Sequence, residues 1–127
     1  MNKSKSLMTS TDILPYLKFI CNKRQEYFVC FSLDSGRRLI RRRVVTIGLL
    51  DVALAHPREV FSGPLKDHAA SIIISHNHSS GVTEPSGQDI QITPQLISAG
   101  QILGIGVWDH IIVTKIDYFS FRNEGLL

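Results

Sequence analysis

The sequence predicts a three-layer α/β sandwich built on a mixed β-sheet. Two observations support this fold class. Short β-branched and aromatic runs alternate with helical patterns along the chain, as expected when helices pack against a sheet. The chain has 127 residues, 43% of them apolar, which suits one domain with a buried core. We find no internal repeat and no domain boundary.

The N-terminal part is predicted to contain a tail and one helix. Residues 1–9 are expected to be disordered, and residues 10–127 are expected to form a single domain. A helix capped by Ser10 or Thr11 would run to about Arg24, with its apolar residues on one side.

A hairpin and a second helix are predicted next. Residues 26–34 form a strand-like run, and Asp34-Ser35-Gly36 is a turn signal before a returning strand over residues 37–48. Residues 49–56 fit either a short edge strand or a turn. Pro57 stands at the first position of a helix, which Gly63-Pro64 would weaken or kink. The residues expected to point inward from it are Val60, Phe61 and Leu65.

The second half predicts a buried strand, a helical region and two further strands. The continuous apolar run over residues 71–75 is typical of a strand buried on both faces. Ser86 can cap the following helix, and Pro94 either kinks that helix or starts a second one capped by Thr93. The helical face is expected to contain Leu96, Ile97, Gly100 and Leu103, and the last strands are expected over residues 107–114 and 118–121.

Charge and cysteine content narrow the class of protein. The formal net charge is +3, and much of it comes from the run Arg37–Arg43. This run would attract phosphates, as in DNA binding, or would be a solvated strand whose charge discourages edge pairing. Cys21 and Cys30 are expected to be reduced core residues. With no long apolar run and no signal peptide, we expect a cytoplasmic protein without membrane contact.

The segment Ser75–Asp89 holds the residues with the clearest chemistry. His76 and His78 are two apart after a strand, so their rings can face one point. Asp89 follows at the start of a helix. Two imidazoles and one carboxylate, with a fourth position for water, match the ligands of a catalytic zinc ion. Each fragment also has a structural explanation, because paired histidines often pack in strands and Ser86-x-x-Asp89 is a capping box.

The spacing HxH-x7-S-x2-D resembles that of JAMM-motif metalloproteins of the JAB/MPN type. Further segments resemble the C-terminal domain of bacterial RadC-family proteins, over about residues 26–125. The resemblance implies a JAB/MPN, cytidine-deaminase-like architecture. The matching segments are LDSGRRLI (33–40), HPREVF (56–61), SHNHSSG (75–81), EPSGQDI (84–90) and DHIIV (109–113).

The resemblance also implies a function and a set of site residues. It implies a zinc-dependent metallopeptidase or isopeptidase, in which zinc-activated water attacks an amide carbonyl of an unknown protein or peptide. Ser86 would donate a hydrogen bond to the developing oxyanion. Glu26 would take a proton from the water and deliver it to the leaving amine, with Glu59 and Glu84 as competing candidates. The implied zinc ligands are His76, His78 and Asp89.

Several features depart from the family pattern or leave alternatives. Ser79 stands where the family usually has proline, and Pro94 is unusual for its helix. The upstream helical region of longer members has no counterpart, so we expect a short form or an isolated catalytic domain. Asp109-His110 could contact the metal-bound imidazoles. The alternative function is a DNA-repair-associated binding or accessory module with structural or vestigial zinc, which would contact DNA through Arg37–Arg43.

Overall fold

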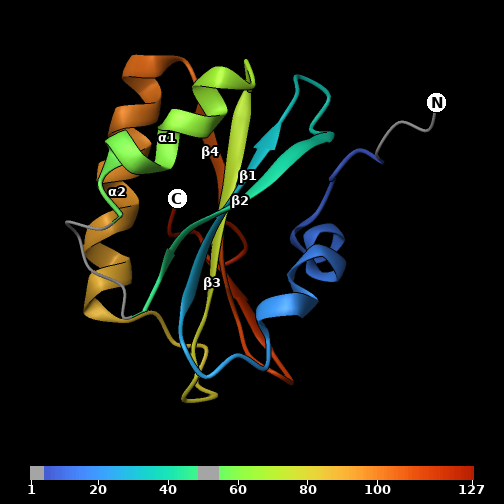
Figure 1. Cartoon of the computed structure of the whole chain (residues 1–127), viewed down its shortest axis with the longest axis vertical. Helices are drawn as coiled ribbons and strands as arrows, with labels where there is room; N and C mark the ends of the chain where they lie inside the picture. Colours follow the sequence, from blue (N-terminus) through green and yellow to red (C-terminus); the bar gives the residue numbers. More distant parts are fainter. Residues whose placement is uncertain (1–4, 49–54) are drawn as a thin grey trace.

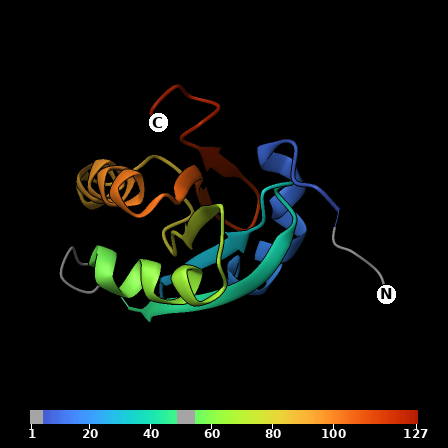
Figure 2. The same ribbon diagram turned by 90° about the horizontal axis from the view of Figure 1, so that it is seen from above.

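A computed structural model describes residues 5–48 and 55–127. The described part of the chain contains one mixed sheet with helices on both faces (Figures 1 and 2). The predicted α/β sandwich is therefore confirmed. The elements are η1 (Ser10–Ile20), β1 (Tyr27–Leu33), β2 (Leu39–Ile47), α1 (Pro57–Lys66), β3 (Ser71–Asn77), α2 (Gly87–Leu103), β4 (Gly106–Val113) and β5 (Tyr118–Ser120).

The strand order is β2-β1-β3-β4-β5. Only β3 and β4 pair in parallel, and the other neighbouring strands of this sheet are antiparallel. A parallel pair needs a crossover connection, and α2 lies in that connection. The end of β3 and the start of α2 are joined by the loop over residues 78–86.

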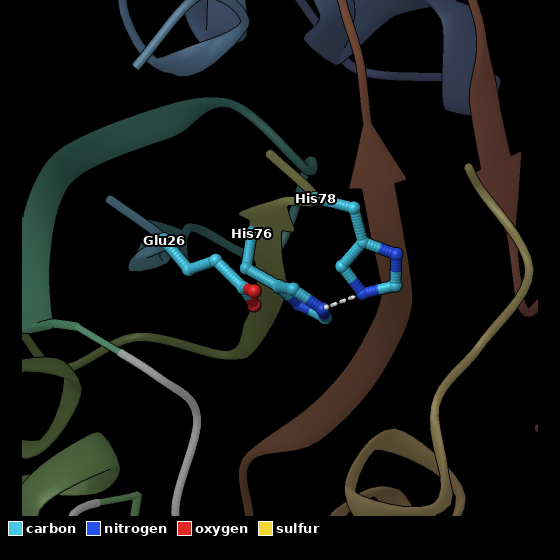
Figure 3. Close-up of side chains that lie close together, drawn as sticks. All are labelled: Glu26, His76 and His78. Atoms are coloured by element: carbon cyan, nitrogen blue, oxygen red, sulfur yellow. Dashed lines mark hydrogen bonds between the residues drawn. The ribbon is translucent and has the colours of Figure 1, made fainter. Parts of the chain in front are cut away.

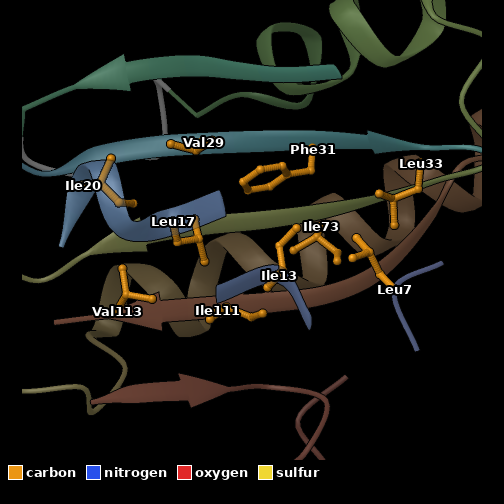
Figure 4. Close-up of a cluster of buried hydrophobic side chains, with 10 residues drawn as sticks. All are labelled: Leu7, Ile13, Leu17, Ile20, Val29, Phe31, Leu33, Ile73, Ile111 and Val113. Carbon is orange, nitrogen blue, oxygen red and sulfur yellow. The ribbon is translucent and has the colours of Figure 1, made fainter. Parts of the chain in front are cut away.

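Two hydrophobic clusters fill the space on either side of the sheet, because alternate strand residues point to opposite faces. On one face, α1 and α2 cover Phe28, Cys30, Ile72 and Ile74. On the other face, η1 packs against the strands (Figure 4). The buried residues of that second cluster are Leu7, Ile13, Leu17, Ile20, Val29, Phe31, Leu33, Ile73, Ile111 and Val113.

The N-terminal region differs from the prediction. Its helix is a 3-10 helix that ends at Ile20, and its N-cap is Thr9 instead of Ser10 or Thr11. Part of the expected tail, residues 1–4, lies outside the described residues. Leu7 is only 2% exposed, and its N–H donates to the Arg37 carbonyl at 2.9 Å. Leu7 therefore packs in the core beneath η1, whereas Lys5, Met8 and Thr9 are exposed.

The two α-helices run through the prolines that were expected to disturb them. In α1, Pro64 is buried while Leu65 is 46% exposed, so the predicted inward position of Leu65 is wrong by one residue. In α2, Pro94 removes one backbone donor, and the affected carbonyl is that of Ile90, on an exposed part of the helix. Water can satisfy that carbonyl, and the helix continues.

Two smaller points concern the ends of elements. Of the residues predicted to share one helical face, Leu96 and Gly100 are buried, whereas Leu103 is 41% exposed, because the helix ends there and Gly104 turns the chain with φ 73°. The alternatives predicted for residues 49–56 fall mostly on 49–54, outside the described ranges. Among the described helices, none is long and apolar enough to cross a membrane.

Candidate metal centre

The structure brings the three predicted ligands together where β3 ends and α2 begins. His76 is the penultimate residue of β3, His78 follows the strand directly, and Asp89 lies in the first turn of α2. The Nε2 atoms of His76 and His78 are 3.0 Å apart. The Asp89 carboxylate places Oδ1 2.9 Å from Nε2 of His76 and Oδ2 3.2 Å from Nε2 of His78.

These distances fit a metal ion with nitrogen and oxygen ligands. Ligand atoms at zinc distances of 2.0–2.1 Å in a tetrahedral arrangement lie about 3.3 Å from one another. The buried Oδ1 of Asp89 also has no hydrogen-bond partner among the described residues, although Nε2 of His76 is so near. A buried acceptor without a donor calls for an explanation, and a cation between these atoms would provide one.

The loop after β3 fixes the ring of His78. Its Nδ1 lies 2.8 Å from the carbonyl oxygen of Val82. A carbonyl only accepts hydrogen bonds, so Nδ1 carries the proton and the neutral ring offers the Nε2 lone pair to the centre. Gly81, with φ 85°, makes the turn that returns the Val82 carbonyl to the ring.

His76 contacts a third histidine that the sequence identified only as one of a pair. Nδ1 of His76 lies 3.1 Å from Nε2 of His110 on β4. Nδ1 of His110 lies 2.7 Å from Oγ1 of Thr93 on α2. His110 is fully buried and stacks on Phe121 with ring centroids 4.4 Å apart. The contact arises because β3 pairs with β4. The sequence alone does not predict the register of these two strands, so it did not predict the contact.

Asp109, the other member of that pair, has a different task. Its carboxylate accepts hydrogen bonds from the hydroxyls of Ser10 and Ser120, both at 2.6 Å. It also accepts the backbone N–H groups of His110 and Arg122. Asp109 therefore ties η1 and the C-terminal segment to β4, and of the pair only His110 contacts a candidate ligand, His76.

The start of α2 stabilises Asp89 as a carboxylate. Ser86 and Asp89 form a reciprocal capping box, with Ser86 N donating to Oδ2 at 2.7 Å and Asp89 N donating to Ser86 Oγ at 3.2 Å. Burial would raise the pKa of Asp89, but it is held below its usual range, with the Ser86 N–H lowering it and the ring nitrogens of His76 and His78 contributing only when they carry a proton. By contrast, burial holds the pKa of His110 well below its ordinary value.

Glu26 lies directly before β1 and faces the ligands. Its carboxylate and the ring nitrogens of His76 and His78 lie within 4.8 Å of one another, and Figure 3 shows the carboxylate directed towards the His76 ring. Of the competing acids, Glu84 lines the same cleft as Glu26. Glu59 is exposed in the first turn of α1, where it contacts Arg58.

Asn77, between the two ligand histidines, holds the backbone on either side of Glu26. Its Oδ1 accepts the N–H of Tyr27 at 2.6 Å. Its Nδ2 donates to the carbonyls of Gln25 at 3.0 Å and Lys23 at 3.3 Å. Asn77 is completely buried and points to the face of the sheet opposite His76. The strand β3 and its end thus position the two ligand histidines and also Glu26.

Two clefts meet at His78. The first has a volume of about 510 Å³, and its lining includes Glu26, Glu84 and Ser86. The second has a volume of about 490 Å³, and its lining includes Lys23, Arg24 and Lys115. Both volumes are in the range of small-molecule and peptide sites. The metal centre therefore has an acidic cleft on one side and a basic cleft on the other.

The fold and the site define a mixed-sheet α/β domain with a candidate metal centre beside an open cleft. Comparison with known families shows that the model of the RadC-like JAB domain matches residues 7–126. The chain belongs to this family.

Relatives with similar sequences occur in bacteria and archaea. A UPF0758 protein of Methanospirillum hungatei is 47% identical over 85% of the chain and 48% of its own length. A UPF0758 protein of Chlorobium chlorochromatii is 35% identical over 99% of the chain and 57% of its own length. One from Bacillus cereus is 43% identical over 80% of the chain and 45% of its own length. The chain spans about half the length of the curated relatives it matches.

Proposed function

We propose that this chain is a zinc-dependent hydrolase of the JAMM type that cleaves a peptide or isopeptide amide. The observation that carries this proposal is the convergence of His76, His78 and Asp89 beside Glu26 at the wall of an open cleft. Two imidazoles and one carboxylate are a donor set that suits zinc and leaves a position open. When bound, zinc supplies a Lewis acid and lowers the pKa of water to about 7.

The chain's own residues would handle the proton and the developing charge. Glu26 is half-buried beside the ligands, where a carboxylate can take a proton from water and later give it to the leaving amine. Ser86 uses its oxygen lone pair to accept the Asp89 N–H. Its hydroxyl proton is then available to donate towards an oxyanion in the cleft that Ser86 lines.

The two clefts favour an extended substrate that passes His78. The basic cleft has Lys23, Arg24 and Lys115 in its lining, and none of the described residues that line it is acidic. It would attract acidic side chains on one side of the scissile amide. A peptide library analysed by mass spectrometry should then show cleavage sites enriched in Asp or Glu on one side only, and absence of such enrichment would contradict this part of the proposal.

The alternative of a DNA-repair-associated module depends on the basic run at residues 37–43. Neighbouring arginines of this run have partners on opposite faces of β2. Arg43 pairs with Asp67, next to α1, whereas Arg42 lies 4.1 Å from the ring centroid of Phe19 in η1. The positive charge is therefore divided between two surfaces, which favours the hydrolase over a continuous DNA-binding patch.

Zinc content and turnover of two variants test the proposal. Protein purified without chelator should contain about one zinc per chain. His78→Ala should lose both zinc and activity towards the peptide library. Glu26→Gln should keep zinc but lose turnover by at least about 100-fold. His68→Asn is a matched control, because His68 is exposed with φ 54°, a conformation that asparagine tolerates.

Two outcomes would overturn the hydrolase. One is wild-type protein with less than about half an equivalent of zinc under these conditions. The other is a Glu26→Gln variant that cleaves as fast as wild type. A DNA-binding module would instead leave Glu26→Gln silent and lose DNA affinity when Arg41 and Arg42 are changed to Gln, with a reduced salt dependence.

A further inference from the structure

The ring of His76 differs from that of His78 in how its proton is placed. The carbonyl oxygen of Val82 can only accept a hydrogen bond, so this contact by itself places the proton of His78 on Nδ1. His76 instead faces another imidazole, Nε2 of His110, at 3.1 Å. An imidazole nitrogen can donate or accept, so the tautomer of His76 depends on what His110 does with its other nitrogen.

The second nitrogen of His110 meets a hydroxyl whose proton is already engaged. Oγ1 of Thr93 donates to the carbonyl of Asp89 at 2.8 Å. Oγ1 therefore acts as acceptor in its 2.7 Å contact with Nδ1 of His110, and this nitrogen carries the proton. In the neutral ring, Nε2 of His110 then has a lone pair that accepts from Nδ1 of His76.

We propose that His110, oriented by Thr93, is a positioning residue that holds His76 in the tautomer with the proton on Nδ1 and the lone pair of Nε2 facing Asp89. The inference rests on the proposed metal site and deepens it, since only an unprotonated Nε2 can bind a cation. Neither His110 nor Thr93 touches the centre directly.

The packing keeps this arrangement fixed. His110 stacks on Phe121 and forms a T-shaped contact with Phe28, with ring centroids 4.4 and 6.4 Å away. Thr93 is one helical turn after Asp89 on α2, and its hydroxyl bonds to the carbonyl of that residue. The first two turns of α2 therefore supply one ligand and also set the tautomer of another.

A competing reading is that His110 is itself a ligand. His76, Asp89 and His110 offer ligand-type atoms within 4.8 Å of one another, so a second cation could in principle lie between them. If this cation were bound by Nδ1 of His76, which faces His110, that nitrogen would have to be unprotonated. The two readings differ in the number of zinc ions per chain and in the tautomer of His76.

The test combines zinc affinity with the tautomer of His76. His110→Phe keeps a ring in the aromatic site and removes both nitrogens. Thr93→Val keeps the shape and removes the hydroxyl, and Thr93→Ser is its matched control with the hydroxyl retained. Chelator competition gives zinc affinity, and two-bond proton–nitrogen NMR correlations of ¹⁵N-histidine protein give tautomers, with five histidines to assign.

The metal-free wild type should show His76 with its proton on Nδ1. His110→Phe should weaken zinc binding by roughly 10–100-fold and abolish the preference for this tautomer. Thr93→Val should change zinc affinity and the His76 tautomer in the same direction as His110→Phe, but by a smaller amount. It serves as the test if His110→Phe does not fold. Thr93→Ser should match wild type.

Three results would overturn the positioning role. They are a proton on Nε2 of His76 in the metal-free wild type, unchanged zinc affinity in His110→Phe and Thr93→Val, and two zinc ions per chain. Failure of the hydrolase looks different. If the wild type binds no zinc while His76 carries its proton on Nδ1, the proposed function falls and the tautomer assignment is supported.

Discussion

Asn77→Ala is expected to destabilise the protein strongly without removing any metal ligand. The side chain is fully buried and bonds to backbone groups of Tyr27, Gln25 and Lys23 at 2.6, 3.0 and 3.3 Å. These groups flank Glu26 on both sides. The alanine variant leaves them without their partner and opens a small cavity in the face of the sheet under η1.

The size of the effect follows from the burial of each group. A buried N–H without an acceptor costs about 1–3 kcal/mol, and this applies to Tyr27. The Gln25 contact contributes about 1 kcal/mol. The Lys23 contact is the longest of the three, so it contributes little. We therefore expect the free energy of unfolding to fall by about 2–4 kcal/mol, in the range of a broken buried network.

Urea denaturation at pH 7 with a chelator present measures this loss in the metal-free protein. Asn22→Ala is the matched control, since Asn22 is exposed on the same segment and its removal should change stability by less than about 0.5 kcal/mol. Zinc content of Asn77→Ala should stay at the wild-type level, while turnover falls because the segment carrying Glu26 loosens. An unfolding free energy within about 0.5 kcal/mol of wild type would refute the reasoning.

Two further predictions concern residues away from the centre. Gly100→Ala should destabilise by about 1–3 kcal/mol in urea unfolding, because a Cβ there would clash with the carbonyl of Ile105. Gly87→Ala, whose Cβ would meet nothing within 4 Å, should be neutral or slightly stabilising, and equal effects of the two would contradict this account. Asp67→Asn should lower the free energy of unfolding by about 1 kcal/mol at pH 7, since the hydrogen bond with Arg43, a part-buried pair, lowers the pKa of Asp67 from 3.8 to about 2. The lowered pKa makes this contribution complete above about pH 4 and lost as the pH falls towards 2, so the difference between variant and wild type should shrink over that range, and a constant difference would argue against the ion pair.

The sequence predicted most of the secondary structure and the proximity of the three ligands because their signals are local. The apolar run before His76 marks a buried strand, and Ser86-x-x-Asp89 marks a helix start. Asp89 is expected near the histidines because it lies in the first turn of the helix that follows their strand. Glu26 was predicted as a site residue only from the family resemblance. It lies far from His76 in the sequence, so no local pattern connects the two residues.

The remaining features depend on pairings between distant segments. His110 meets His76 only through the register of β4 on β3, in which His76 pairs with Ile112. Leu7 is buried only because η1 lies on the far face of the sheet, and a short polar tail such as MNKSKS gives no sign of this. The prediction for α1 was right for Val60 and Phe61 but wrong for Leu65, because Pro64 faces the core in its place.

The topology divides the site into two parts that can fail separately. The β3-α2-β4 crossover supplies the ligands as well as His110 and Thr93. Glu26 comes from the start of β1, and the side-chain bonds of Asn77 hold the backbone beside it against the ligand strand. Damage to the crossover should therefore reduce metal binding, while damage at Asn77 should leave the metal and reduce turnover. Such a separation fits a centre in which one unit holds the cation and another moves the proton.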